Sequence, residues 1–305
     1  MLKARASADL SKMKKLGFIG GGNMAEALIR GLLGRRVFTA ADLVASDVDR
    51  GRLQRLKRTV KIDVTDSNHQ VVGDARAILI AVKPQNIEEV LAELITGTAV
   101  SRAQSPDSKR ISTRAELHKP SVRLEQRLFI SIVAGITIAR LSESLGPRVR
   151  IVRVMPNAPA MVGEGMAAIV PGPAATRADV GFALKIFNAV GDAVALRDEK
   201  LLDAVTALSG SGPAYVYLFV KALADAAVAE GLPADLALRM ALKTIRGAES
   251  NMRQSKLDAG ELIRVVASPG GTTEAALRKF VDSRFSDIVA GAVHAAAERS
   301  RELGR

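Results

Sequence analysis

An α/β protein with two domains is predicted by the 305-residue sequence: a parallel β-sheet covered by helices on both faces, then a domain of helices alone. In the first two thirds of the chain, short apolar runs alternate with helical patterns, which is typical of strands buried on both faces of a parallel sheet. From about residue 199, helical spacing alone continues to the C-terminus. The predicted domains are therefore residues 15–198 and residues 199–305.

In the first domain the expected elements alternate between strand and helix. Strands are expected at 15–20, 43–47, 77–82, 128–133 and 151–155, and helices at 23–33, 52–57 and 87–94. Residues 97–127 are polar, basic and without an apolar period, so we interpret them as a surface insertion between a helix and the next strand.

In the second domain only helices are expected. They are predicted at 200–208, 214–230, 234–252, 259–266, 273–281 and 286–301. The helix at 214–230 is apolar around most of its circumference, and such a helix is buried. Two covers for it stay open: a second subunit, or the other helices of a monomeric bundle.

Composition narrows the kinds of site and partner. The chain has no Cys, which excludes disulfides and thiolate chemistry, and its three His are far apart, so no metal centre is expected. Most of the net charge of +12 lies in residues 1–15 and 97–127, and aromatic residues make up only 3%, so no nucleic-acid partner is expected. The longest uncharged apolar stretch, 204–220, is interrupted by glycines and a proline, and residues 1–14 lack an apolar signal core. We expect a cytoplasmic protein without a membrane partner.

A glycine-rich turn predicts a dinucleotide site. Gly20-Gly21-Gly22-Asn23-Met24-Ala25 fits G-x-G-x-x-(G/A) directly after a predicted strand and at the start of a predicted helix. In such a turn Gly20 permits the tight bend, Gly22 lets the backbone approach a pyrophosphate, and Ala25 keeps helix and sheet close.

The ends of later strands add candidate contacts to the dinucleotide. Asp47 ends the second strand, where an Asp usually accepts hydrogen bonds from the adenosine ribose and disfavours a 2′-phosphate. Arg50 and Arg52 follow it and are able to serve such a phosphate, so NAD and NADP both stay open. Val82 and Lys83 end the third strand, at the edge where ligands bind in open α/β sheets.

Asn157 follows the last predicted strand, in Met155-Pro156-Asn157-Ala158-Pro159, where two prolines fix a rigid loop. Its amide is able to hydrogen-bond near a nicotinamide or to satisfy the backbone of a plain turn, and both readings stay open.

A second glycine-rich loop predicts an anion site. Ser268-Pro269-Gly270-Gly271-Thr272-Thr273 runs into a predicted helix, whose unpaired N–H groups and partial positive charge suit a carboxylate or a phosphate. The alternative is an ordinary helix start in which Thr272 is the N-cap and nothing binds.

Five motifs in this order resemble those of pyrroline-5-carboxylate reductases over about residues 15–301. They are Phe18 to Ala25, Ala81-Val82-Lys83-Pro84, Met155 to Ala160, Leu208 to Tyr215, and Ser268 to Thr273. The resemblance implies an N-terminal Rossmann-type domain and an all-α dimerisation domain that intertwines with a second subunit, as a homodimer or a higher ring of dimers. It further implies an oxidoreductase of proline biosynthesis that reduces the C=N bond of 1-pyrroline-5-carboxylate to L-proline with NADPH or NADH.

The resemblance also implies which residues form the site. Residues expected along the cofactor are Ile19, Gly20, Gly21, Gly22, Asn23, Met24, Asp47, Asn68, Ala81, Val82, Lys83, Pro84, Ile132, Val133, Ala134 and Asn157. Residues expected to bind the substrate are Gly271, Thr272 and Thr273. Our hypothesis is that the backbone N–H groups of Gly271 and Thr272 hold the substrate carboxylate, while Thr273 hydrogen-bonds the ring nitrogen and is the catalytic residue.

The chain departs from the pattern of that family in the insertion at 97–127 and at two further places. Ile263, Arg264 and Val265 stand where members usually show a polar run, and Asp47 replaces a small hydroxyl residue. Two other functions stay under consideration. A β-hydroxyacid dehydrogenase needs a catalytic Lys shortly after a Gly-rich turn, but Lys221 has the wrong spacing and is better interpreted as a helix-surface or interface residue. A non-enzymatic dinucleotide sensor would keep the Gly20 motif without needing a second glycine-rich loop.

Overall fold

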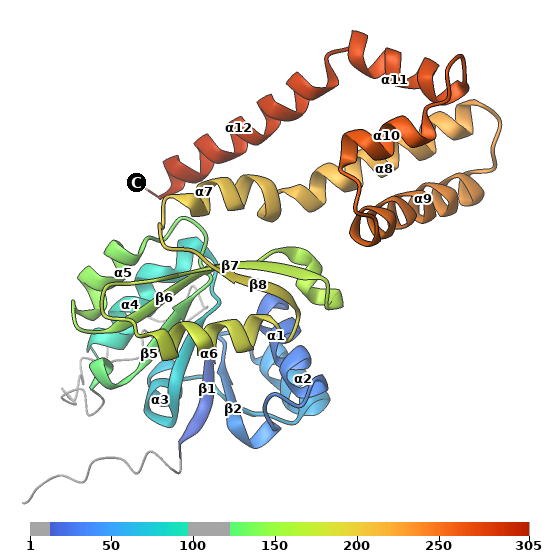
Figure 1. The fold of residues 1–305 in the computed structure, drawn as a ribbon. Coiled ribbons are helices and arrows are strands. Elements are labelled where there is room, and N and C mark those ends of the chain that lie inside the picture. The colour runs from blue at the N-terminus through green and yellow to red at the C-terminus, as the bar shows by residue number, and fades with distance from the viewer. Residues whose placement is uncertain (1–12, 97–122, 305) are drawn as a thin grey trace, which may run out of the picture. The chain divides into compact units, whose positions relative to one another are not determined.

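The computed structural model describes residues 13–96 and 123–304, and Figure 1 shows the arrangement of their helices and strands. The predicted insertion at 97–127 lies outside the described residues except for its last five positions. The chain divides into two compact units. One contains the residues up to Gly210 together with those from Arg299 onward, and the other is Ser211–Glu298.

The first unit contains a single eight-stranded sheet of order β3-β2-β1-β4-β5-β6-β7-β8. Its strands are β1 (Lys14–Ile19), β2 (Leu43–Ser46), β3 (Asp63–Thr65), β4 (Ala75–Ile80), β5 (Leu128–Ser131), β6 (Arg150–Met155), β7 (Gly165–Pro171) and β8 (Gly191–Ala195). Every neighbouring pair is parallel except β6 with β7. The order of the first six strands is that of a dinucleotide-binding Rossmann sheet, which confirms the predicted fold class.

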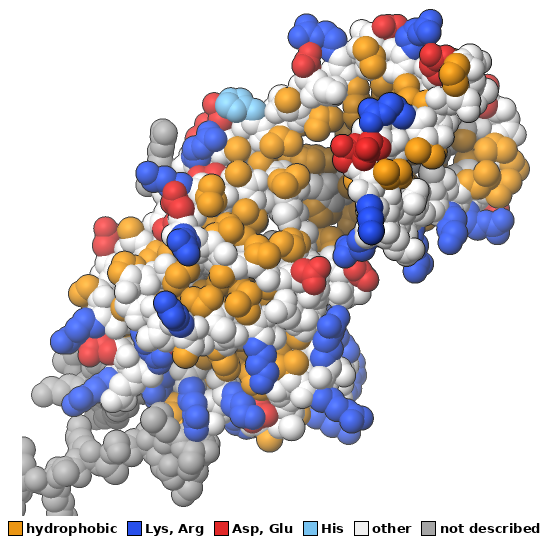
Figure 2. Space-filling view, viewed as in Figure 1, with side chains coloured by type: hydrophobic (Ala, Val, Ile, Leu, Met, Phe, Trp, Pro, Cys, Tyr) orange, Lys and Arg blue, Asp and Glu red, His pale blue; other side chains and the backbone are white. Residues whose placement is uncertain are grey.

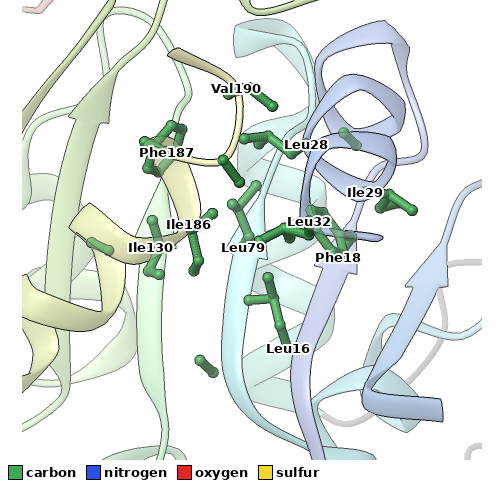
Figure 3. Packing of buried hydrophobic residues seen from close by; sticks show 14 of the residues in the cluster. Leu16, Phe18, Leu28, Ile29, Leu32, Leu79, Ile130, Ile186, Phe187 and Val190 are labelled. Carbon is green, nitrogen blue, oxygen red and sulfur yellow. The ribbon is translucent and has the colours of Figure 1, made fainter. Parts of the chain in front are cut away.

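Helices cover both faces of this sheet (Figure 1). They are α1 (Asn23–Gly34), α2 (Arg50–Val60), α3 (Asn68–Asp74), α4 (Ile87–Thr96), α5 (Ile138–Leu145), α6 (Arg177–Phe187) and α7 (Leu201–Val205). One apolar core joins α1, α2 and α6 to side chains such as Phe18 and Leu79, and Figure 3 shows α1 and α6 side chains converging over the strands. A second core joins α3, α4 and α5 to Ile78 and Phe129 on the opposite face. The alternation of side chains along each strand thus fills two cores, as a doubly covered sheet requires.

Five helices make up most of the rest of the chain, and all five were expected from the sequence. They are α8 (Gly212–Ala229), α9 (Ala234–Gln254), α10 (Ala259–Val266), α11 (Thr272–Asp282) and α12 (Phe285–Leu303). Between α7 and α8, residues Thr206–Gly210 form a π-helical turn, η6. The last turn of α12 belongs to the first unit, where Ser300 Oγ donates to Asp203 Oδ1 at 2.7 Å.

Among the described residues, helix α8 is covered on one side only, where Val220 and Ala224 pack against α9. Only Val220 and Ala224 are buried along it, whereas Tyr217 is 64% exposed and Leu218 is 70% exposed. The reading of this helix as the centre of a monomeric bundle is therefore wrong. Within the described residues, Leu201–Ala229 is also long and apolar enough to cross a membrane by length and composition, which for a single helix is weak evidence.

We expect Gly191→Ala to destabilise the fold by about 3 kcal/mol or more. Gly191 has φ +151°, and a Cβ placed there would lie 1.9 Å from the carbonyl oxygen of Gly165, its partner across β7 and β8. The matched control is Gly181→Ala on the exposed surface of α6, where a Cβ meets nothing within 4 Å. That change should stabilise the protein by about 0.5–1 kcal/mol. Urea unfolding of both variants at equal protein concentration tests this, and equal midpoints would contradict it.

Candidate functional site

The glycine turn has the shape expected of a phosphate cradle. Gly20 has φ +97°, and a Cβ there would lie 2.7 Å from the Ala81 carbonyl oxygen, so only glycine fits this bend. Gly22 is the N-cap of α1, and no side chain caps the helix. A Cβ on Gly22 would meet nothing within 4 Å, so the surface over the first turn of α1 is open. Ala25 is fully buried between helix and sheet.

Asp47 ties the end of β2 to this turn. Its Oδ2 accepts a hydrogen bond from the Gly21 N–H at 2.7 Å, and its Oδ1 accepts one from the Asp49 N–H at 2.8 Å. The side chain is only 6% exposed, and Arg52 Nη1 lies 3.5 Å from Oδ2. The Asp47 carboxylate is therefore held beside the glycine turn and forms an ion pair with Arg52.

Asn68 joins three elements behind the turn. Its Oδ1 accepts from Ser46 Oγ at 2.6 Å, at the end of β2, and its Nδ2 donates to Glu93 of α4 at 2.7 Å. Asn68 itself is the first residue of α3, after the N-cap Ser67. The side chain thus holds the carboxyl edge of the sheet against the helices of one face.

The ends of three adjacent strands bring most of the other candidate cofactor residues together. The Ala81 N–H donates to the Ile19 carbonyl at 2.8 Å, and the Ile132 N–H donates to the Ile80 carbonyl at 3.1 Å. Ile19 and Val133 are buried in the second core, so they have only main-chain atoms to offer a ligand. Residues 82–84 leave β4 half-exposed or exposed at this edge, and Ala134 does the same after β5.

Asn157 makes three hydrogen bonds to the protein. Its Nδ2 donates to the carbonyl and the hydroxyl of Ser209, at 3.2 and 3.1 Å, and its Oδ1 accepts from the Met166 N–H at 2.8 Å. These contacts are those of the backbone-satisfying alternative, and a role at the nicotinamide stays a prediction. Asn157 thereby clamps the π-helical turn η6 to β7, a link that the sequence did not reveal. Such turns are frequent at functional sites.

In the helical unit, the N-terminus of α11 is free of side-chain caps. The N-cap is Gly271, with φ −83° and ψ 171°, so the reading of Thr272 as the cap is wrong: Thr272 is the first helical residue. The Gly271 N–H donates to the Ser268 carbonyl at 3.0 Å, so it is not available for a carboxylate, contrary to our hypothesis. Glu274 turns back and accepts from the Gly270 N–H at 2.7 Å.

The N–H groups left open at this terminus are those of Thr272, Thr273 and Glu274. Neither they nor the two threonine hydroxyls have a hydrogen-bond partner among the described residues. Gly270, with φ +70°, turns the chain just ahead of them. Three N–H groups and two hydroxyls are therefore unpaired among the described residues at one helix start, which suits a small anion with a second polar atom.

Two other predicted features have clear places in this unit. Lys221 is exposed on α8 and pairs with Asp225 one turn later, which agrees with either a helix-surface or an interface residue. Ile263 and Val265 are exposed on α10, at 48% and 68%, where members of the resembling family usually carry polar residues. Among the described residues, no group of three His, Cys, Asp or Glu is placed to hold a metal ion.

Comparison with known families matches both parts of the chain. Residues 15–104 match the profile described as NADP oxidoreductase coenzyme F420-dependent, and residues 199–303 match the one described as pyrroline-5-carboxylate reductase dimerisation.

Curated relatives align along nearly the whole chain. The pyrroline-5-carboxylate reductase of Methanosarcina acetivorans is 37% identical over 96% of this chain and 98% of its own length. That of Pisum sativum is 37% identical over 96% and 97%. Among solved structures, the Plasmodium falciparum pyrroline carboxylate reductase with NADP bound superposes with a TM-score of 0.80 at 30% identity, over 96% of this chain and 99% of that one.

Proposed function

The chain belongs to the pyrroline-5-carboxylate reductase family, and we propose that it reduces the C=N bond of 1-pyrroline-5-carboxylate to L-proline, the last step of proline biosynthesis. The observation that carries this proposal is the alignment of relatives at 37% identity along 96% of the chain, because it includes the glycine turn at Gly20 and the loop at Gly271 together.

On the cofactor side, residues 15–198 would bind NADPH or NADH, whose nicotinamide supplies the hydride. The uncapped first turn of α1, formed by Asn23 and Met24 behind Gly22, would donate its N–H groups to the pyrophosphate. Asp47 would accept from the adenosine ribose. The strand ends at 81–84 and 132–134 would line the remaining length of the cofactor, with Asn157 beyond them.

On the substrate side, residues 199–305 would hold the imine and form the dimer. The open N–H groups of Thr272 and Thr273 would bind the substrate carboxylate at the positive end of α11. The Thr273 hydroxyl would hydrogen-bond the ring nitrogen, which fixes the face of the ring presented for reduction. A cyclic imine is already electrophilic, and more so when protonated, so the residues need mainly to align it with the nicotinamide.

A spectrophotometric assay tests the function directly. Purified protein with 1-pyrroline-5-carboxylate should consume NADPH or NADH and yield L-proline, identified by chromatography, whereas β-hydroxyacids with the oxidised cofactors should give no reaction. Dinucleotide binding without turnover of the imine would favour the sensor instead. Turnover of a β-hydroxyacid alone would favour the dehydrogenase.

A dimer, or a ring of dimers, is part of the proposal. The family profile that matches residues 199–303 is a dimerisation domain, and hydrophobic side chains gather on the surface of the helical unit (Figure 2). Many of them lie on α8 and α9, including Val216, Tyr217, Leu218 and Leu242. Exposed apolar area of this kind marks an association surface. We place the enzyme in the cytoplasm, without nucleic-acid or membrane partners, and assign the cover of α8 to the second subunit.

We expect Leu218→Glu to raise the dimer dissociation constant at least about a hundredfold, because in the proposed dimer the second subunit covers α8 and would bury an unpaired carboxylate there. Light scattering after gel filtration, across a dilution series, measures this. The matched control is Ile95→Glu, at a 45% exposed position on α4, which should leave the mass unchanged. A wild-type monomer, or an unchanged mass for Leu218→Glu, would contradict the proposal.

A further inference from the structure

We infer that this enzyme prefers NADH to NADPH, and that the carboxylate of Asp47 sets the preference. The inference rests on the proposed function, since it concerns the cofactor of that reaction. It is carried by the position, the fixation and the surroundings of the carboxylate. In a Rossmann sheet, the residue that ends the second strand faces the adenosine ribose of the dinucleotide.

The first step is that Asp47 has no freedom to turn aside. The Gly21 and Asp49 N–H groups each donate to one of its oxygens, at 2.7 and 2.8 Å, and the side chain is 6% exposed. An ionised carboxylate offers about four acceptor sites. Arg52 Nη1, 3.5 Å from Oδ2, occupies a third, so one site is left, on Oδ1. A ribose hydroxyl of NADH would donate to that site. A 2′-phosphate brings no such donor and adds about −1.5 to −2 charges.

The second step concerns the two arginines that follow Asp47 in the sequence. Arg52 lies 3.5 Å from the Asp47 carboxylate and 3.4 Å from that of Asp49, so two acidic groups share its charge. Arg50 pairs with Asp66 at 3.6 Å and is largely exposed. Asp47, Asp49 and Asp66 thus pair with these two guanidinium groups near the ends of β2 and β3. Recognition of a 2′-phosphate instead needs Arg or Lys whose charge is not already shared.

The third step concerns the residue beside the carboxylate. Val48 follows Asp47 directly and is 81% exposed, so the side chain nearest in sequence has no hydrogen-bond donor to offer a phosphate. The Plasmodium falciparum relative was solved with NADP bound, so the inference separates this chain from that one in cofactor choice while keeping the same reaction.

Titration of bound nicotinamide fluorescence tests the inference without turnover. The wild type should bind NADH at least about tenfold tighter than NADPH, because a phosphate would stand against a fixed anion. Asp47→Asn keeps an acceptor for the Gly21 N–H but removes the charge. In this variant the dissociation constant of NADPH divided by that of NADH should fall at least about tenfold. The matched control is Asp49→Asn, which removes an equal charge nearby and still caps α2. There the ratio should stay within about threefold, because solvent and salt screen the exposed Asp49 carboxylate.

Equal or tighter binding of NADPH by the wild type would overturn the inference, as would an equal shift in Asp49→Asn. Should Asp47→Asn fail to fold, competition on the wild type carries the same test, because ADP must displace NADH better than 2′,5′-ADP does. If NADH binds preferentially but 1-pyrroline-5-carboxylate is not reduced, the proposed reaction fails and the cofactor inference stands. If neither dinucleotide binds, the inference fails.

Discussion

Gly22→Ala should fold as the wild type does and lose about a hundredfold or more in kcat/KM for the dinucleotide. Gly22 has φ −70° and ψ −178°, a conformation that alanine adopts freely, and its Cβ would meet nothing within 4 Å. The methyl group would instead occupy the space above the first turn of α1, where the pyrophosphate must approach the backbone. The cost should therefore fall on cofactor binding and not on stability.

Two glycines act as references for this experiment. Gly34→Ala, at the far end of the same helix, also adds a methyl group in open space and should leave kcat/KM unchanged. Gly20→Ala should lose stability as well as activity, because its φ of +97° and the Ala81 carbonyl exclude a Cβ. Fluorescence titration with dinucleotide and thermal unfolding separate the three cases. A Gly22→Ala enzyme with the affinity of the wild type would show that the phosphates bind elsewhere.

Thr273→Ala should lower kcat/KM for 1-pyrroline-5-carboxylate by about 10- to 100-fold, the equivalent of one hydrogen bond to a charged group. The Thr273 hydroxyl has no partner among the described residues, so its removal should leave the fold intact. Thr273→Ser keeps the hydroxyl and should recover most of the activity. A loss confined to kcat would indicate a contact made mainly in the transition state, whereas a loss confined to KM would indicate uniform binding. Wild-type values of both kcat and KM in Thr273→Ala would contradict the proposed hydrogen bond between Thr273 and the substrate.

Most of the sheet was predictable because its strands are runs of large apolar residues. The strands β1, β2, β4, β5 and β6 were all expected, since Leu, Ile, Val and Phe dominate them. Three strands were missed for physical reasons. β3 has only three residues, none of them buried. β7 and β8 are rich in Gly and Ala, so their hydrophobicity differs little from that of the residues on either side. β7 runs antiparallel to β6, and the spacing of apolar residues in the sequence does not indicate the direction of a strand.

The site was predictable as a set of motifs but not as a set of contacts. The glycine turn and the loop before α11 stand out through residue types alone. Which backbone groups remain open does not, because Gly271 and Thr272 are both able to cap a helix, and only the chain geometry decides. The clamp between Asn157 and Ser209 joins residues 52 positions apart, and the π-helical turn that it holds is five residues long, too short to carry a period.

Because the end of α12 returns to the first unit, both ends of the helical unit are joined to that unit. The chain departs after Gly210 and comes back at Arg299, where Ser300 bonds to Asp203 and the Leu303 carbonyl lies against Gly135. Closing this loop costs conformational entropy, which the contacts of the returning turn must offset. A protein cut before Arg299 would lose these contacts, and the nucleotide unit would lack its last turn of helix. Its helical unit would then be joined to the nucleotide unit at one end only.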